Sequence, residues 1–324
     1  MADNTTSVIP DDLNTPEIIR IKYIVLQVLQ IFSWPIYFFV FFHILTNKTQ
    51  RKSLNNHVII VLLLSNSFQL FFDLSLVLSW LHQGIIRPAT PATCYFWNFM
   101  NYWAYYTSFI IMLWASFERH ILVFHAHMVR TKRGKFIFHY LPLVCTLIYS
   151  LVYYVYFIFL YPCKNDFDYE VGWCGFMCYQ NYAASWILIY EYLAHEIIPM
   201  FLEVFLSILL ILRVVFQRRQ GAHWRRNRKM ILQLLSISFL STAFNIPDVI
   251  SPLYYLIFDV ELIAENIQEF ILAYVGYGTC IFLPITCLTT IPHVKEKLFN
   301  MIDYRRWLDF EKKQQRIVPT SRHP

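Results

Sequence analysis

The stretch that decides the fold is CYFWNFMNYWAYYTSFIIMLWASFERH, which runs from Cys94 to His120. It is apolar over most of its length and ends in the charged triplet Glu118-Arg119-His120. Cys94 and Glu118 are 24 residues apart, so a helix between them rises about 36 Å, against roughly 30 Å of bilayer hydrocarbon. We therefore expect the cysteine at one membrane face and the charged triplet at the other.

The composition is that of an integral membrane protein, because 57% of the 324 residues are hydrophobic and only 15% are charged. Seven apolar stretches are each long enough for a membrane helix, at 23–45, 57–81, 95–124, 136–161, 185–216, 230–258 and 267–291. The predicted fold class is an all-α integral membrane protein, a seven-transmembrane helix bundle with a short amphipathic C-terminal helix.

Three regions follow from this pattern. Residues 1–20 are polar and acidic and form the expected extracellular N-terminal segment, with no apparent signal peptide, so the first span acts as the insertion signal. Residues 21–292 form the seven-transmembrane domain. Residues 293–324 form a cytoplasmic tail, in which 293–308 mixes basic and apolar residues as a helix on the membrane surface does.

The distribution of charge predicts the orientation. Lys and Arg gather in the gaps on one side of the stretches, at 48–52, 130–135 and 218–229, and in the tail. The positive-inside rule then predicts a multi-pass plasma-membrane protein with an extracellular N-terminus and a cytoplasmic C-terminus. The net charge of +6 follows from loops that face anionic lipid, so the bilayer, and no nucleic acid, is the expected partner. Asn4-Thr5-Thr6 is a glycosylation sequon on the expected outer side.

Four of the seven cysteines, Cys94, Cys163, Cys174 and Cys178, fall on the predicted outer side. Four cysteines in an oxidising space predict two disulfides, with three possible connectivities.

The spacing from Cys94 to the triplet at 118–120, together with Pro199, Pro247 and Pro284 in the last three spans, resembles the rhodopsin-like (class A) G-protein-coupled receptors. The resemblance covers nearly the whole chain. It implies that Cys94 bonds to a cysteine of the second outer loop, for which we expect Cys178 first and Cys174 second.

The resemblance also implies an activation switch made of Glu118, Arg119, His120, Asn66, Pro247 and Pro284. A charged arginine at the membrane edge is costly unless it is paired, and Glu118 is the expected resting partner of Arg119. The chain departs from the family's pattern at Asn66, where the family usually has an aspartate. Asn101 and Tyr277 replace the residues that hold amines and retinal in the family, which disfavours an aminergic receptor and an opsin.

Buried polar residues are the best guide to a ligand pocket. We expect these side chains to line an outward-opening cavity: Asp73, Asn98, Asn101, Tyr105, Glu196, Asp248 and Tyr277. The alternative is that each of them bonds to a neighbouring helix instead. The acidic outer loops favour cationic ligands, small or peptidic.

The resulting prediction is a receptor that passes binding of an extracellular small molecule or peptide to a heterotrimeric G protein by outward movement of the sixth helix. The short basic loop at 217–226 would flank the G-protein cleft. The alternative is a small seven-span transporter or channel subunit. We expect no enzyme activity, cofactor or metal, because His57, His125, His139 and Asp73 fall on different predicted faces and depths.

Overall fold

A computed structural model describes residues 15–216, 221–258 and 273–290 of the chain. Several predictions therefore lie outside the described residues: the sequon at Asn4, most of the N-terminal segment, the loop at 217–220, the acids at 259–269 and the whole tail with its surface helix.

All regular elements in the described residues are helical. They are α1 (Pro16–Thr46), α2 (Lys48–Lys52), α3 (Leu54–Phe68), η1 (Gln69–Asp73), α4 (Leu74–Gln83), α5 (Pro91–Phe124), α6 (Lys132–Lys135), η2 (Phe136–Tyr140), α7 (Leu141–Val155), η3 (Tyr156–Leu160), η4 (Gly172–Cys174), α8 (Cys178–Tyr182), α9 (Ser185–Tyr192), η5 (Leu193–Ile197), α10 (Ile198–Phe216), α11 (Gly221–Phe258) and α13 (Ala273–Thr290). The segment η4 is a short 3₁₀ turn. The other η segments are π-helical turns within longer helices.

Five continuous helices are long and apolar enough to cross a membrane: Pro16–Thr46, Asn56–Gln83, Pro91–Phe124, Lys132–Leu160 and Ser185–Val214. They coincide with the first five predicted spans, and the protein is a membrane-embedded, all-α protein. The sixth and seventh predicted stretches coincide with α11 and α13, and the apolar part of α13, Tyr274–Thr289, is shorter than the other five helices. The count of seven spans stays a prediction.

The side chains of α1 have the distribution expected of a helix in lipid. Phe32 and Phe38 are 67% and 64% exposed, whereas Gln30 and Ser33 are buried against the other helices. A polar group in hydrocarbon needs a partner inside the protein, and Gln30 accordingly donates to the backbone carbonyl of Leu70 at 2.7 Å.

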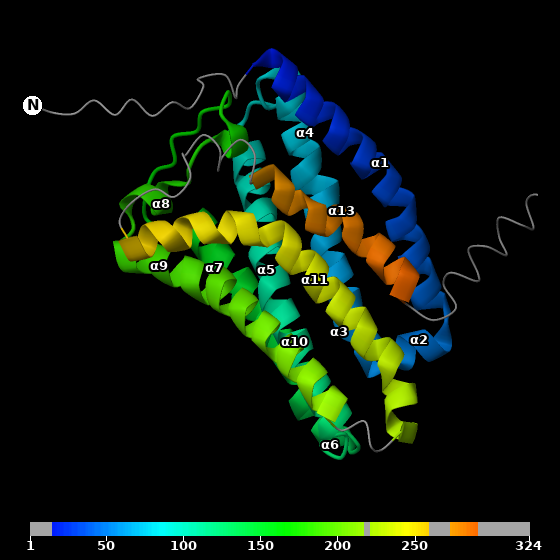
Figure 1. The fold of residues 1–324 in the computed structure, drawn as a ribbon. Coiled ribbons are helices and arrows are strands. Elements are labelled where there is room, and N and C mark those ends of the chain that lie inside the picture. The colour runs from blue at the N-terminus through cyan, green and yellow to red at the C-terminus, as the bar shows by residue number, and fades with distance from the viewer. Residues whose placement is uncertain (1–14, 217–220, 259–272, 291–324) are drawn as a thin grey trace, which may run out of the picture.

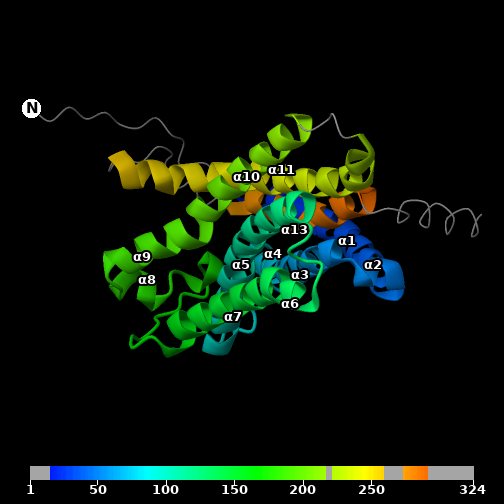
Figure 2. The same cartoon turned by 90° about the horizontal axis from the view of Figure 1, so that it is seen from below.

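The helix α5 is the centre of the bundle (Figure 1). It packs against α3, α7, α10 and α11. On the other side of the bundle, α13 packs against α11, α1 and α3. Figure 2 shows α11 and α13 side by side.

Prolines interrupt the backbone bonding of the last helices. Pro284 has no N–H to give to the carbonyl four residues earlier, which is that of Cys280. The hydroxyl of Tyr37 on α1 donates to this carbonyl at 2.8 Å, and Ser33 donates to the neighbouring Ile281 carbonyl at 2.7 Å. Two side chains of α1 thus supply hydrogen-bond donors to backbone carbonyls of α13 near the place where Pro284 interrupts its helical hydrogen bonds.

Candidate functional site

A cavity of about 240 Å³ lies between the start of α5 and the loop that follows η3. It is lined by Gln69, Asn101, Tyr102, Tyr105, Tyr106, Val171, Gly172, Trp173, Gly175, Phe176, Asp248, Gly276 and Tyr277. Four of the predicted ligand residues are among these: Asn101, Tyr105, Asp248 and Tyr277. The other three, Asp73, Asn98 and Glu196, are buried behind residues that line the cavity.

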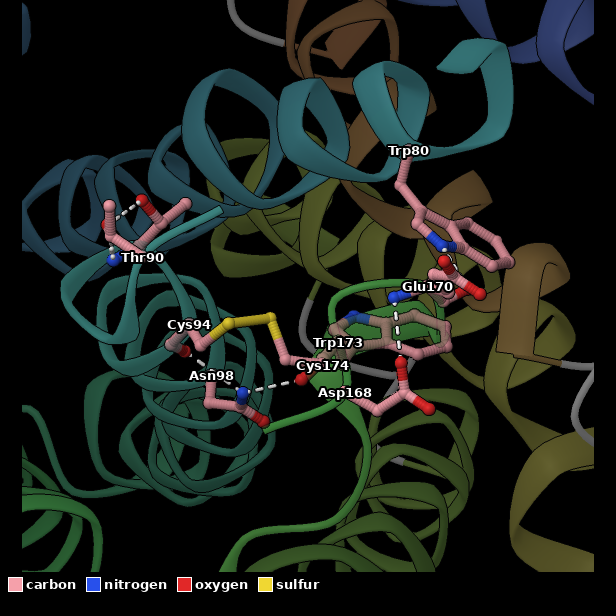
Figure 3. Close-up of a disulfide and its surroundings, with 9 residues drawn as sticks. Trp80, Thr90, Cys94, Asn98, Asp168, Glu170, Trp173 and Cys174 are labelled. Carbon is pink, nitrogen blue, oxygen red and sulfur yellow. Dashed lines mark hydrogen bonds between the residues drawn. A yellow bond between two sulfur atoms is a disulfide. The ribbon is translucent and has the colours of Figure 1, made fainter. Parts of the chain in front are cut away.

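One side of the cavity is a loop segment fixed by a disulfide. Cys94 bonds to Cys174, so the first expected partner, Cys178, is wrong and the second is right (Figure 3). Cys178 bonds to Cys163 instead. The reason is local, because the backbone N–H of Cys178 donates to Asn165 Oδ1 at 2.7 Å and so lies beside the start of the loop.

Hydrogen bonds hold the same loop segment against α5 and α4 (Figure 3). Asn98 Nδ2 donates to the carbonyls of Cys94 at 3.0 Å and of Trp173 at 2.7 Å. Trp80 Nε1 donates to the Glu170 carbonyl at 2.9 Å. Asn98 is therefore a clamp for the loop, which corrects its expected role as a cavity-lining residue.

The backbone of this loop segment is strained. Trp173 and Cys174 have φ values of 54° and 58°, in the left-handed region that side chains other than glycine rarely occupy. The disulfide and the bond from Asn98 over-determine this conformation. They fix the Trp173 ring in the wall of the cavity.

Asp73 is fully buried and well supplied with donors. Its Oδ1 accepts from Trp97 Nε1 at 2.9 Å, and its Oδ2 accepts from Asn101 Nδ2 at 3.1 Å and from the Tyr277 hydroxyl at 2.7 Å. These donors come from α5 and α13, so Asp73 links three helices. Asp73 thus follows the alternative reading, in which a buried acid bonds to neighbouring helices.

Two further carboxylates, those of Glu196 and Asp248, have fewer hydrogen-bond donors than Asp73. The Tyr105 hydroxyl lies 2.8 Å from Glu196 Oε1 and 3.3 Å from Asp248 Oδ2. A phenol has one proton, and it can donate to only one of the two at a time. Within the described residues neither carboxylate has an ion pair with Lys, Arg or His.

Two of these three acids lie in π-helical turns. Asp73 ends η1 and Glu196 lies in η5. A π-turn inserts one extra residue and rotates the side chains that follow, and such turns are frequent at functional sites. A regular helical wheel therefore assigns residues that follow these turns to the wrong face of the helix.

At the other end of α5 the charged triplet is buried. Glu118 is fully enclosed and is hydrogen-bonded to His139 of η2. His139 Nε2 lies 3.0 Å from His57 Nδ1, and His57 Nε2 lies 2.8 Å from the Arg51 carbonyl. The hydrogen-bond partner of Glu118 in this conformation is thus a histidine, where we expected Arg119 as its resting partner.

The remaining predicted switch residues lie at helix contacts. His120 Nε2 donates to the Leu206 carbonyl of α10 at 2.9 Å. Asn66 Nδ2 donates to the Leu62 carbonyl at 2.9 Å and to Ser108 Oγ at 3.2 Å, joining α3 to α5. Pro247 lies within α11, one residue before Asp248.

Sequence reasoning missed several residues. Trp97 lies one helical turn before Asn101 on α5, and this spacing in the sequence could have indicated that both side chains contact Asp73. No comparable spacing indicates the aromatic residues that line the cavity, which are Tyr102, Tyr106, Trp173 and Phe176. The expectation that His57 and His139 lie on different faces is wrong, since α3 and η2 bring them into contact.

Searches against models of known protein families and against curated protein sequences find no match to the chain.

Proposed function

We propose that this protein is a divergent receptor of the rhodopsin-like G-protein-coupled class. It would bind an extracellular ligand in the cavity and pass the signal to a heterotrimeric G protein at the opposite end of the bundle. The supporting observation is the arrangement on α5, which carries the cavity beside Cys94 and the buried Glu118 and Arg119 at its far end.

The cavity supports this proposal because it joins helices that could move relative to one another. Its lining comes from α5, α11 and α13, together with the clamped loop segment. A ligand that contacts several helices can favour one arrangement of the bundle over another, which is what linkage requires of a switch. In the proposed mechanism α11 moves outward at its Gly221 end and opens a groove for the G protein.

The experiment is ligand-independent G-protein activation in cells that express wild type, Glu118→Gln or Arg119→Ala at matched surface levels. We expect Glu118→Gln to raise the basal signal, because it weakens the charge pairing that holds the end of α5. Arg119→Ala should abolish the signal. Silence of all three variants across the major G-protein classes would contradict the proposal, and solute uptake by the same cells would support a transporter instead.

A further inference from the structure

Two carboxylates share one donor at the cavity, that of Asp248, which lines it, and that of Glu196, which is buried behind Tyr105. Asp73 has three hydrogen-bond donors, whereas Glu196 and Asp248 have only the Tyr105 hydroxyl between them within the described residues. That hydroxyl lies closer to Glu196 than to Asp248, by 2.8 Å against 3.3 Å. Asp248 is therefore the carboxylate with the weaker partner, and it is the one that lines the cavity.

The walls of the cavity suit a cation as well. Tyr102, Tyr106 and Trp173 line the cavity together with Asp248. Aromatic faces attract ammonium and guanidinium groups, because the face of the ring carries partial negative charge. The volume of about 240 Å³ lies below the usual range for ligand pockets of roughly 300–1,000 Å³, which favours a small molecule over a peptide.

From these observations we infer that the cavity binds a small organic cation, whose positively charged group is bound by Asp248. When the ligand occupies Asp248, Glu196 accepts the hydrogen bond of the Tyr105 hydroxyl. The family's amine site uses an aspartate on the third helix, where this chain has Asn101, so the carboxylate here comes from the sixth helix instead. The inference names the ligand class of the receptor proposed above and rests on that proposal for its biological use.

The test is direct binding to the purified full-length protein in lipid nanodiscs, measured by calorimetry and by ligand-induced thermal stabilisation. The probes are 2-phenylethylamine, phenyltrimethylammonium and phenylguanidine, with the neutral alcohol 2-phenylethanol as the matched control. We expect at least one of the three cations to bind and the alcohol to bind at least about tenfold more weakly, since it lacks the charge that pairs with a buried carboxylate.

Asp248→Asn should weaken binding of the same cation by at least about tenfold, as loss of a buried charge partner does. Glu191→Gln is the matched control, because Glu191 is also buried and accepts from a phenol, that of Tyr179 at 3.0 Å, but does not line the cavity. It should change the affinity by less than about threefold, as expected for a site without shared contacts. Melting of each variant without ligand checks that it is folded.

Three results would overturn the inference: no binding of any cation, equal binding of 2-phenylethanol, or unchanged affinity in a folded Asp248→Asn protein. These results are distinct from failure of the proposed function. Cation binding without G-protein activation would refute the receptor and keep the site. Activation without cation binding would do the reverse.

Discussion

Glu118 near the end of α5 and His139 of η2 are joined by a buried hydrogen bond. The chain of bonds runs from Glu118 through His139 and His57 to the Arg51 carbonyl. This chain of bonds joins the buried end of α5 to η2 and to the start of α3, although His57 and His139 are 82 residues apart in sequence.

The two disulfides should differ in their contribution to stability. Cys94–Cys174 closes a segment of 80 residues and Cys163–Cys178 one of 15. In the chain-entropy account the longer loop contributes about 1.5 kcal/mol more. Cys94→Ala/Cys174→Ala should therefore unfold at a lower temperature than Cys163→Ala/Cys178→Ala, and mass mapping of the oxidised wild type should find the Cys94–Cys174 peptide pair. A Cys94–Cys178 peptide would contradict the connectivity.

The sequence was sufficient for the apolar helices, because long apolar runs have few alternatives in lipid. It also identified Asp73, Tyr277 and Asn101 as buried polar residues, and the structure joins all three. It could not choose between Cys174 and Cys178, which are one helical turn apart in sequence. That choice depends on the hydrogen bond from the Cys178 backbone N–H to Asn165 Oδ1, which no spacing rule contains.

Contacts between distant segments explain the remaining differences. His57 and His139 are 82 residues apart in sequence, and they meet only because the folded chain places the start of α3 beside η2. The facing of Glu196 depends on the π-turn η5, which a regular helical wheel does not represent. In both cases the deciding information is the packing of helices, which periodicity along one helix does not contain.

The packing of α11 on α13 depends on Gly278. A β-carbon there would lie 2.2 Å from the Phe244 ring, whereas one on Gly276 would meet only Asn245 Oδ1 at an ordinary 3.5 Å. Gly278→Ala should destabilise the protein by about 1–3 kcal/mol, the usual cost of overpacking a core. Gly276→Ala is the control and should cost less than about 1 kcal/mol. Equal melting temperatures for the two variants would show that Phe244 can move aside without cost.

The last prediction concerns the contact between α1 and α13. Tyr37→Phe removes only the hydroxyl that donates to the Cys280 carbonyl, the acceptor that Pro284 leaves without its usual helical donor. An unsatisfied buried carbonyl costs about 1–3 kcal/mol, and lipid offers no replacement donor. Thermal unfolding of the variant should therefore start several degrees below wild type. Tyr182→Phe, at a residue that is 76% exposed, is the control and should change the free energy of unfolding by less than about 0.5 kcal/mol. If both variants melt like wild type, the bond from Tyr37 does not stabilise the break in α13.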